Sequence, residues 1–155
     1  MPAQLGQLHP VSVRSQWPDE AADFTPWLAK EESIARLGEA LGLELEVVQT
    51  EVAVGPYSAD ILARDSAGDT VVIENQLGKT DHDHMGKALT YAAVLGAHTV
   101  VWVAAAFSDE HRIVVESREE LPKNGGILCA LRHPVHLGLE LLGGDGALPE
   151  LFQRR

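Results

Sequence analysis

Apolar and polar residues alternate through the middle of the chain in a pattern that predicts three neighbouring strands. The segments 43–54, 57–64 and 70–76 are rich in β-branched residues, and the short turns G-P-Y-S and D-S-A-G-D separate them. Connections of this length join antiparallel hairpins. The last segment, T-V-V-I-E-N-Q, is unusual because a strand with the composition of a protein core ends in Glu74 and Gln76.

Helical spacing flanks these strands on both sides. The first helix is predicted over 26–41, with a proline at its first position, Thr25 as N-cap and Gly42 as its C-terminal stop. The second helix is predicted over 80–95, and Thr80 begins it as the N-cap of a capping-box sequence, T-D-H-D.

The second half of the chain predicts a parallel addition to the sheet. The run T-V-V-W-V-A-A-A-F over 99–107 has the apolar character of a fully buried strand. A strand joined through a helix to another strand implies a right-handed parallel crossover. A third helix over 108–121 and two further strands, I-L-C-A-L-R and V-H-L-G-L-E-L-L, are predicted beyond it. The expected fold class is therefore α/β, with αβββαβ order and a mixed central sheet flanked by helices.

The length of 155 residues fits one domain with one main core. Residues 1–25 contain three prolines and little periodicity, so we expect an irregular N-terminal arm, packed down by Trp17 and Trp27. No apolar run approaches the roughly 20 residues of a membrane helix, and no signal-peptide pattern opens the chain, so a cytoplasmic location without membrane contact is expected.

The charge balance limits the kinds of partner. The apolar fraction of 45% and the charged fraction of 23% are those of a globular protein. The formal net charge of −11 argues against avid, unaided binding of nucleic acid, which usually needs a basic surface. Bound cations that offset local carboxylates would remove this objection.

Candidate chemistry lies where two predicted strands pair. Strand side chains alternate between faces, so Glu74 shares a face with Val72 and Gln76, and Asp60 shares one with Ser58 and Leu62. If the strands form a hairpin, Asp60 and Glu74 lie side by side. Two partly buried carboxylates repel each other unless a cation stabilises them. Oxygen ligands that leave room for water favour Mg²⁺ over zinc.

These residues match a known pattern. The segment G-P-Y-S-A-D-I-L-A, thirteen residues between Asp60 and Glu74, and then E-N-Q in αβββαβ order resemble the PD-(D/E)xK nuclease superfamily, which has the restriction-endonuclease-like fold. The chain is also similar to a bacterial group of uncharacterised proteins that carry S-A-D-I-L-A and V-I-E-N-Q-L-G-x-T-D-H-D-H. The resemblance spans about residues 25–112. It implies a nuclease core over 26–112. We expect residues 113–155 to form a C-terminal extension that packs on the same domain.

The resemblance implies roles for several residues. Asp60 takes the position of the first metal-binding aspartate, and Glu74 takes that of the second carboxylate. Gln76 stands where the superfamily usually has a lysine that helps to orient or deprotonate water, and a neutral amide could only orient it. Lys87 on the second helix could supply the missing cation near the scissile phosphate.

Further residues complete the implied site. His84, Lys87 and Tyr91 recur at i, i+3 and i+7 and share a helix face. His82 and His84 diverge on a helix, which disfavours a shared zinc site, and their position after E-N-Q favours contact with a phosphate or substrate. A carboxylate from the first helix is typical of the superfamily. The candidates for it are Glu32, Glu39 and, on the first strand, Glu51.

Three functions remain open from the sequence. The resemblance implies a nuclease that uses Mg²⁺, with Mn²⁺ as an alternative, to hydrolyse phosphodiester bonds in DNA rather than RNA, and that could act as a homodimer. The absent lysine and the net charge favour a catalytically inactive module for dimerisation or nucleic-acid binding. A hydrolase of a small phosphate compound would fit the acidic composition better than a protein that binds bulk DNA.

Overall fold

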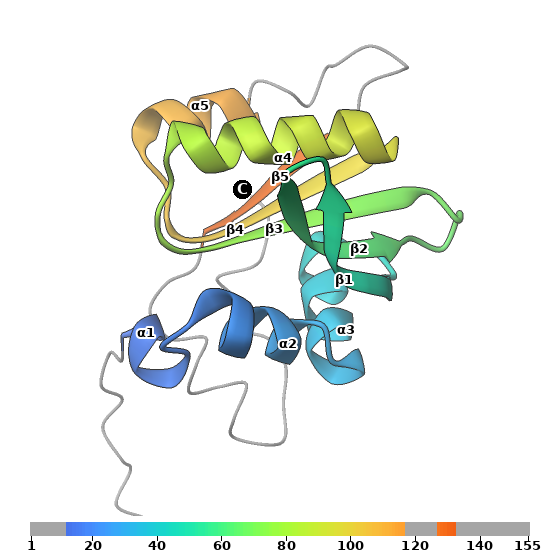
Figure 1. Cartoon of the computed structure of the whole chain (residues 1–155), viewed down its shortest axis with the longest axis horizontal. Helices are drawn as coiled ribbons and strands as arrows, with labels where there is room; N and C mark the ends of the chain where they lie inside the picture. The colour runs from blue at the N-terminus through green and yellow to red at the C-terminus, as the bar shows by residue number, and fades with distance from the viewer. Residues whose placement is uncertain (1–11, 117–126, 133–155) are drawn as a thin grey trace, which may run out of the picture.

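The fold is seen in a computed structural model, which describes residues 12–116 and 127–132, with side chains described for 12–114 (Figure 1). A five-stranded sheet has the order β1-β2-β3-β4-β5. The β1–β2 and β2–β3 pairs are antiparallel, whereas β3–β4 and β4–β5 are parallel. The strands are β1 (Glu46–Val54), β2 (Tyr57–Arg64), β3 (Thr70–Lys79), β4 (Thr99–Ala106) and β5 (Ile127–Arg132). The predicted α/β fold class with a mixed sheet is therefore confirmed.

Helices cover both faces of this sheet (Figure 1). On one side lie α4 (His82–Leu95) and α5 (Asp109–Glu116). On the other side lie the N-terminal helices, namely α1 (Val13–Gln16), the π-helical turn η1 (Glu20–Phe24), α2 (Thr25–Leu28) and α3 (Glu31–Leu41). The parallel β3–α4–β4 connection is the predicted crossover.

The N-terminal segment departs from the prediction. The described residues of the expected irregular arm instead form α1 and η1. The single helix expected over 26–41 is two helices, because Lys30 has extended backbone angles (φ −65°, ψ 145°) and separates α2 from α3. Thr25 is a helical residue of α2 rather than an N-cap. The stop at Gly42 is confirmed by its left-handed φ of 68°.

Other element ends also differ. β3 continues to Lys79, beyond the predicted end. The N-cap of α4 is Asp81, whose side chain accepts a hydrogen bond from the His84 backbone, because the Thr80 hydroxyl instead accepts the Ser108 N–H. The strand over 127–132 is confirmed as β5, whereas V-H-L-G-L-E-L-L and residues 117–121 of the third helix lie outside the described residues.

Two of the apolar clusters contain most of the buried apolar residues in the described part of the chain. One joins the sheet to the N-terminal helices, and it includes Ile61, Val71, Ile73, Val101, Trp17, Phe24, Leu28 and Ile34. The other joins the sheet to α4 through Val54, Ala59, Val72 and Tyr91. Trp17 packs on Phe24 and Trp27 at ring-centroid distances of 5.3 and 4.5 Å, as predicted for the arm. Aromatic residues from the N-terminal segment, which precedes the predicted core, are thus part of the hydrophobic core.

A buried hydrogen bond also ties the N-terminal helices to β3. Asn75 Nδ2 donates to Thr25 Oγ1 at 2.9 Å, and both residues are fully buried. We expect Thr25→Val, which keeps the shape but removes the hydroxyl, to lower the free energy of unfolding by about 1–3 kcal/mol, because the Asn75 amide loses its acceptor. Urea denaturation would measure this, with Thr25→Ser as the control that keeps the hydroxyl. Equal stability of Thr25→Val and the native chain would show that this bond contributes nothing.

Candidate active site

Asp60 and Glu74 lie where β2 and β3 stop pairing. The ladder runs from Arg64↔Thr70 to Ile61↔Ile73, and beyond it Asp60 Oδ2 accepts a hydrogen bond from the Asn75 N–H at 2.7 Å. Asp60 is half-buried, whereas Glu74 is only 4% exposed. Glu74 Oε2 is buried and has no hydrogen-bond partner in the described part of the chain. The structure thus brings the two predicted carboxylates together.

The alternation of β2 breaks at Asp60, contrary to prediction. Ala59 and Leu62 both pack on the α4 side of the sheet, whereas Ile61 and Ala63 pack on the opposite side. Asp60 therefore does not simply share a face with Ser58 and Leu62. It lies at an irregularity, where its carboxylate bonds across to the backbone of β3.

The neighbouring strand is irregular at the same level. Glu51 on β1 has a positive φ of 51°, a conformation that is rare for a residue with a side chain and that clusters at functional sites. Glu51 Oε2 accepts a hydrogen bond from Ser58 Oγ at 3.0 Å. Its charge contributes to raising the pKa of Asp60, so Glu51 belongs to the surroundings of the carboxylate pair.

A third carboxylate, Glu20 on η1, was missed by sequence reasoning. Its Oε2 accepts the Leu77 N–H at 2.5 Å, and its charge acts on both Asp60 and Glu74. The signal that could have located this turn is P-D-E-A-A-D. Asp19 caps η1 by accepting the Ala22 N–H, and Asp23 accepts the Asp19 N–H in return.

The carboxylates proposed from α3 do not contribute to the site with Asp60 and Glu74. Glu32 and Glu39 are both exposed, and neither is among the charges that shift the pKa of Asp60 or Glu74. The helix break at Lys30 turns α3 away as a separate element, so the carboxylate comes from the preceding helical turn. Of the three additional candidates from the sequence, only Glu51 acts on the pair.

Burial makes the carboxylate pair costly to ionise. Burial raises the pKa of Asp60 to about 7, and the charges of Glu20 and Glu51 add to the shift against the lowering effect of the Asn75 N–H. Burial also raises the pKa of Glu74 to about 9, helped by the charge of Asp60 and opposed by that of Lys87. Such a pair strongly favours a bound proton or a bound cation.

Gln76 is held at the end of β3. Its Nε2 donates to the Lys79 carbonyl and to Asp81 Oδ2, both at 2.8 Å. Its Oε1 is buried and has no partner within the described residues. Gln76 and Glu74 are two residues apart on one strand and so share a face, which places Gln76 Oε1 on the same side of the sheet as Glu74 Oε2, the other oxygen without a partner among the described residues.

His84, Lys87 and Tyr91, which the sequence placed on one face of α4, interact electrostatically with the carboxylates. Tyr91 is 1% exposed, and burial followed by the charge of Glu74 raises its pKa. Lys87 Nζ forms an ion pair with Asp83 at 2.6 Å, and its charge also lowers the pKa of Glu74. The charge of His84 lowers the pKa of Asp60. Lys87 and His84 therefore act on the carboxylates, and Glu74 acts on Tyr91.

His82 is placed differently from its α4 neighbours. Its Nδ1 lies 2.9 Å from His111 Nε2, and the two rings stack edge to face. His111 is 5% exposed, and its Nδ1 lies 2.8 Å from Thr80 Oγ1 and 3.0 Å from Ser108 Oγ. These contacts join the β3–α4 junction to α5. His82 therefore packs with α5, and its contacts give a structural reason for its position.

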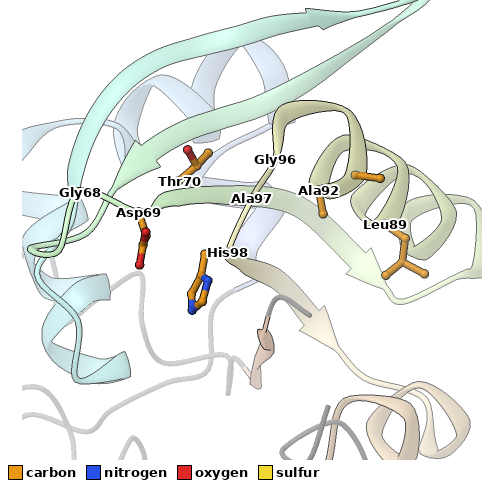
Figure 2. A pocket seen from close by; sticks show the side chains of 9 residues that line it. Gly68, Asp69, Thr70, Leu89, Ala92, Gly96, Ala97 and His98 are labelled. Atoms are coloured by element: carbon orange, nitrogen blue, oxygen red, sulfur yellow. The ribbon is translucent and has the colours of Figure 1, made fainter. Parts of the chain in front are cut away.

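A cavity of about 580 Å³ lies beside Thr70, the first residue of β3 (Figure 2). It is bordered by the turn before β3 and by the end of α4, with Asp69 and His98 as its ionisable groups. Both side chains are exposed, and neither acts on Asp60 or Glu74. The cavity is thus separate from the candidate site.

In the part of the chain that the structure describes, no helix is long and apolar enough to cross a membrane.

The donor set at the site fits a hard divalent cation. No preformed group of three or more His, Cys, Asp or Glu ligands is present within residues 12–116 and 127–132. The pair Asp60 and Glu74 nonetheless offers oxygen donors with raised pKa values, and on this face of β3 Glu74 Oε2 and Gln76 Oε1 are buried without partners among the described residues. A cation there would satisfy these atoms and offset the charge of Glu20.

Comparisons with known proteins support the fold. No family model matches the chain, and no curated protein matches it. A repair endonuclease from Pyrococcus abyssi superposes with a TM-score of 0.50 and 16% identity over 67% of this chain and 46% of that one. An EndoMS complex with double-stranded DNA has a TM-score of 0.49, with 15% identity and coverage of 85% and 49%. EndoMS in apo form has a TM-score of 0.43 and 23% identity, and the match covers 68% of this chain and 47% of that one. The chain thus spans about half the length of these structures, and the likeness concerns the fold alone.

Proposed function

We propose that this protein is a metal-dependent nuclease that hydrolyses phosphodiester bonds in DNA through a variant D…ExQ site. The observation that carries the proposal is the pairing of the half-buried Asp60 with the buried Glu74. Their pKa values are raised to about 7 and about 9, and Glu74 Oε2 has no partner among the described residues. The fold it shares with a repair endonuclease supports this assignment.

Each residue of the site would have a separate role in hydrolysis. Asp60 and Glu74 would hold Mg²⁺ or Mn²⁺, which would supply an activated water and offset charge on the phosphoryl oxygens. Lys87 would bring positive charge to the scissile phosphate from α4, and His84 would contact a neighbouring phosphate. Gln76 cannot remove a proton, because its amide is neutral, so its Oε1 would serve the site only as an acceptor.

A second candidate is a non-catalytic module that binds nucleic acid or forms dimers. It is favoured by one observation at the site, namely that both Nε2 donor contacts of Gln76 are made within the protein, so this side chain cannot replace a lysine cation. The net charge of −11 favours the dimer-forming alternative over either cleavage or binding of nucleic acid. A homodimer and a cytoplasmic location stay predictions from the sequence.

A cleavage assay separates the two candidates. Plasmid and single-stranded DNA would be incubated with the native chain and Mg²⁺ or Mn²⁺, with EDTA as the metal-free control. We expect metal-dependent cleavage that Asp60→Asn and Glu74→Gln abolish. Cleavage that persists in both variants would refute the assigned site. Absence of both cleavage and Mn²⁺ binding in the native chain would favour the non-catalytic module.

A further inference from the structure

The orientation of the Gln76 amide is fixed by two acceptors. Nε2 lies 2.8 Å from the Lys79 carbonyl oxygen and 2.8 Å from Asp81 Oδ2. A carbonyl and a carboxylate can only accept hydrogen bonds, so only the NH₂ end of the amide fits between them. The opposite end, Oε1, therefore must lie away from both, where it is buried without a partner among the described residues.

The carboxylate of Asp81 serves two elements at once. Its Oδ1 accepts the His84 backbone N–H at 2.8 Å, which caps α4, and lies 2.9 Å from His84 Nδ1. Its Oδ2 accepts from Gln76. One side chain thus couples the start of α4, which carries His84 and Lys87, to the end of β3, which carries Glu74.

We propose that Asp81 is a positioning residue that holds the Gln76 amide with Oε1 in the cation site, where this oxygen serves as a neutral ligand beside the carboxylate of Glu74. This inference rests on the proposed metal-dependent function. It assigns to Gln76 a role that differs from that of lysine, because an amide oxygen binds a cation whereas an ammonium group repels it. It assigns to Asp81 the task of preventing the amide from turning.

The burial of Gln76 supports this role. The residue is only 6% exposed, and a buried acceptor without a partner costs about 1–3 kcal/mol. Amide oxygens are among the ligands that hard divalent cations accept. A cation held by Asp60 and Glu74 would satisfy this oxygen without adding a fourth negative charge to a site that already contains Glu20.

Asp81→Asn provides a test that preserves the shape of the side chain. The amide oxygen of the new asparagine can keep the α4 cap, but its NH₂ then faces the NH₂ of Gln76, and two donors cannot bond. Gln76 must turn or move away. We expect the affinity for Mn²⁺, measured by isothermal titration calorimetry, to fall about 10- to 100-fold, as for loss of a residue that orients a metal ligand. Asp109→Asn, which removes the same charge from the first turn of α5, should leave this affinity unchanged.

A second variant and a second measurement distinguish failure of the inference about Asp81 from failure of the proposed function. Asp81→Ser retains an N-cap hydroxyl but has no second oxygen for Gln76, so it should also weaken Mn²⁺ binding even if Asp81→Asn folds poorly. In the metal-free protein, both variants should shift the NMR resonances of the Gln76 side-chain amide and speed its hydrogen exchange. Native Mn²⁺ affinity in both variants would overturn the inference, as would unchanged amide resonances. Failure of the native chain to bind Mn²⁺ would instead refute the proposed function.

Discussion

Glu74→Gln is expected to stabilise the metal-free protein in mildly alkaline solution. The pKa of Glu74 is about 9 in the folded chain, against an ordinary value of 4.5. Between these values the folded state holds a proton that the unfolded state lacks, so the free energy of unfolding falls as the pH rises. Glutamine has no such titration. We therefore expect the variant to be more stable than the native chain by at least about 1 kcal/mol at about pH 8.

Urea denaturation in EDTA at about pH 5 and about pH 8 would measure this difference. The native chain should lose stability between the two conditions, and Glu74→Gln should lose less, with the remaining slope reflecting Asp60, whose folded pKa is about 7. Glu32→Gln, at an exposed position on α3, is the matched control and should follow the native profile. Parallel profiles for the native chain and Glu74→Gln would contradict the raised pKa of Glu74.

Divalent metal should reverse the order of stability. A ligand that binds only the folded state stabilises it by about 2.7 kcal/mol at a hundredfold excess over its dissociation constant. Mn²⁺ should therefore stabilise the native chain at about pH 8 and have little effect on Glu74→Gln, which lacks one ligand. The carboxylate that destabilises the metal-free protein would thus be the group that binds the cation.

The sequence predicted the strands and the carboxylate pair because both depend on local patterns. Alternating apolar residues and short turns specify the β2–β3 hairpin, and the hairpin brings Asp60 towards Glu74. The break of alternation at Asp60 has no local signature in the sequence, and the bond that Asp60 accepts there comes from the Asn75 backbone, fifteen residues away.

Sequence reasoning missed Glu20 and Asp81 because tertiary contacts determine the roles of both residues. Glu20 reaches the site through a contact with Leu77, which is 57 positions away, and its turn lies in a segment without apolar periodicity. Asp81 was not predicted as the N-cap of α4 because Thr80 is an equally suitable cap residue in T-D-H-D. The choice between them depends on Ser108, whose backbone N–H donates a hydrogen bond to the Thr80 hydroxyl. In each case a tertiary contact decides between local alternatives of similar energy.

The positive charge of this site comes from α4 rather than from β3. Two residues after Glu74, β3 carries a neutral amide, that of Gln76. Lys87 and His84 instead lower the pKa values of Glu74 and Asp60, respectively, so both act on the carboxylates from the covering helix. The ion pair of Lys87 with Asp83 holds this charge in place on the helix surface.

Glu20→Gln is expected to weaken Mn²⁺ binding by about 10- to 100-fold and to slow cleavage of DNA by a similar factor. The Oε1 of the new glutamine can accept the Leu77 N–H in place of the carboxylate, so η1 keeps its attachment to β3. The change removes only the negative charge. Since Glu20 raises the pKa values of both Asp60 and Glu74, its loss should also make the metal-free protein less sensitive to pH.

The matched control for this prediction is Glu32→Gln. It removes the same charge from a position that sequence reasoning proposed, and it should leave Mn²⁺ affinity and cleavage unchanged because Glu32 is exposed and does not act on the carboxylate pair. A loss in Glu32→Gln with native behaviour in Glu20→Gln would restore α3 as the source of the third carboxylate. A loss in Glu20→Gln alone would instead identify η1, a turn in the segment expected to be irregular, as part of the metal site.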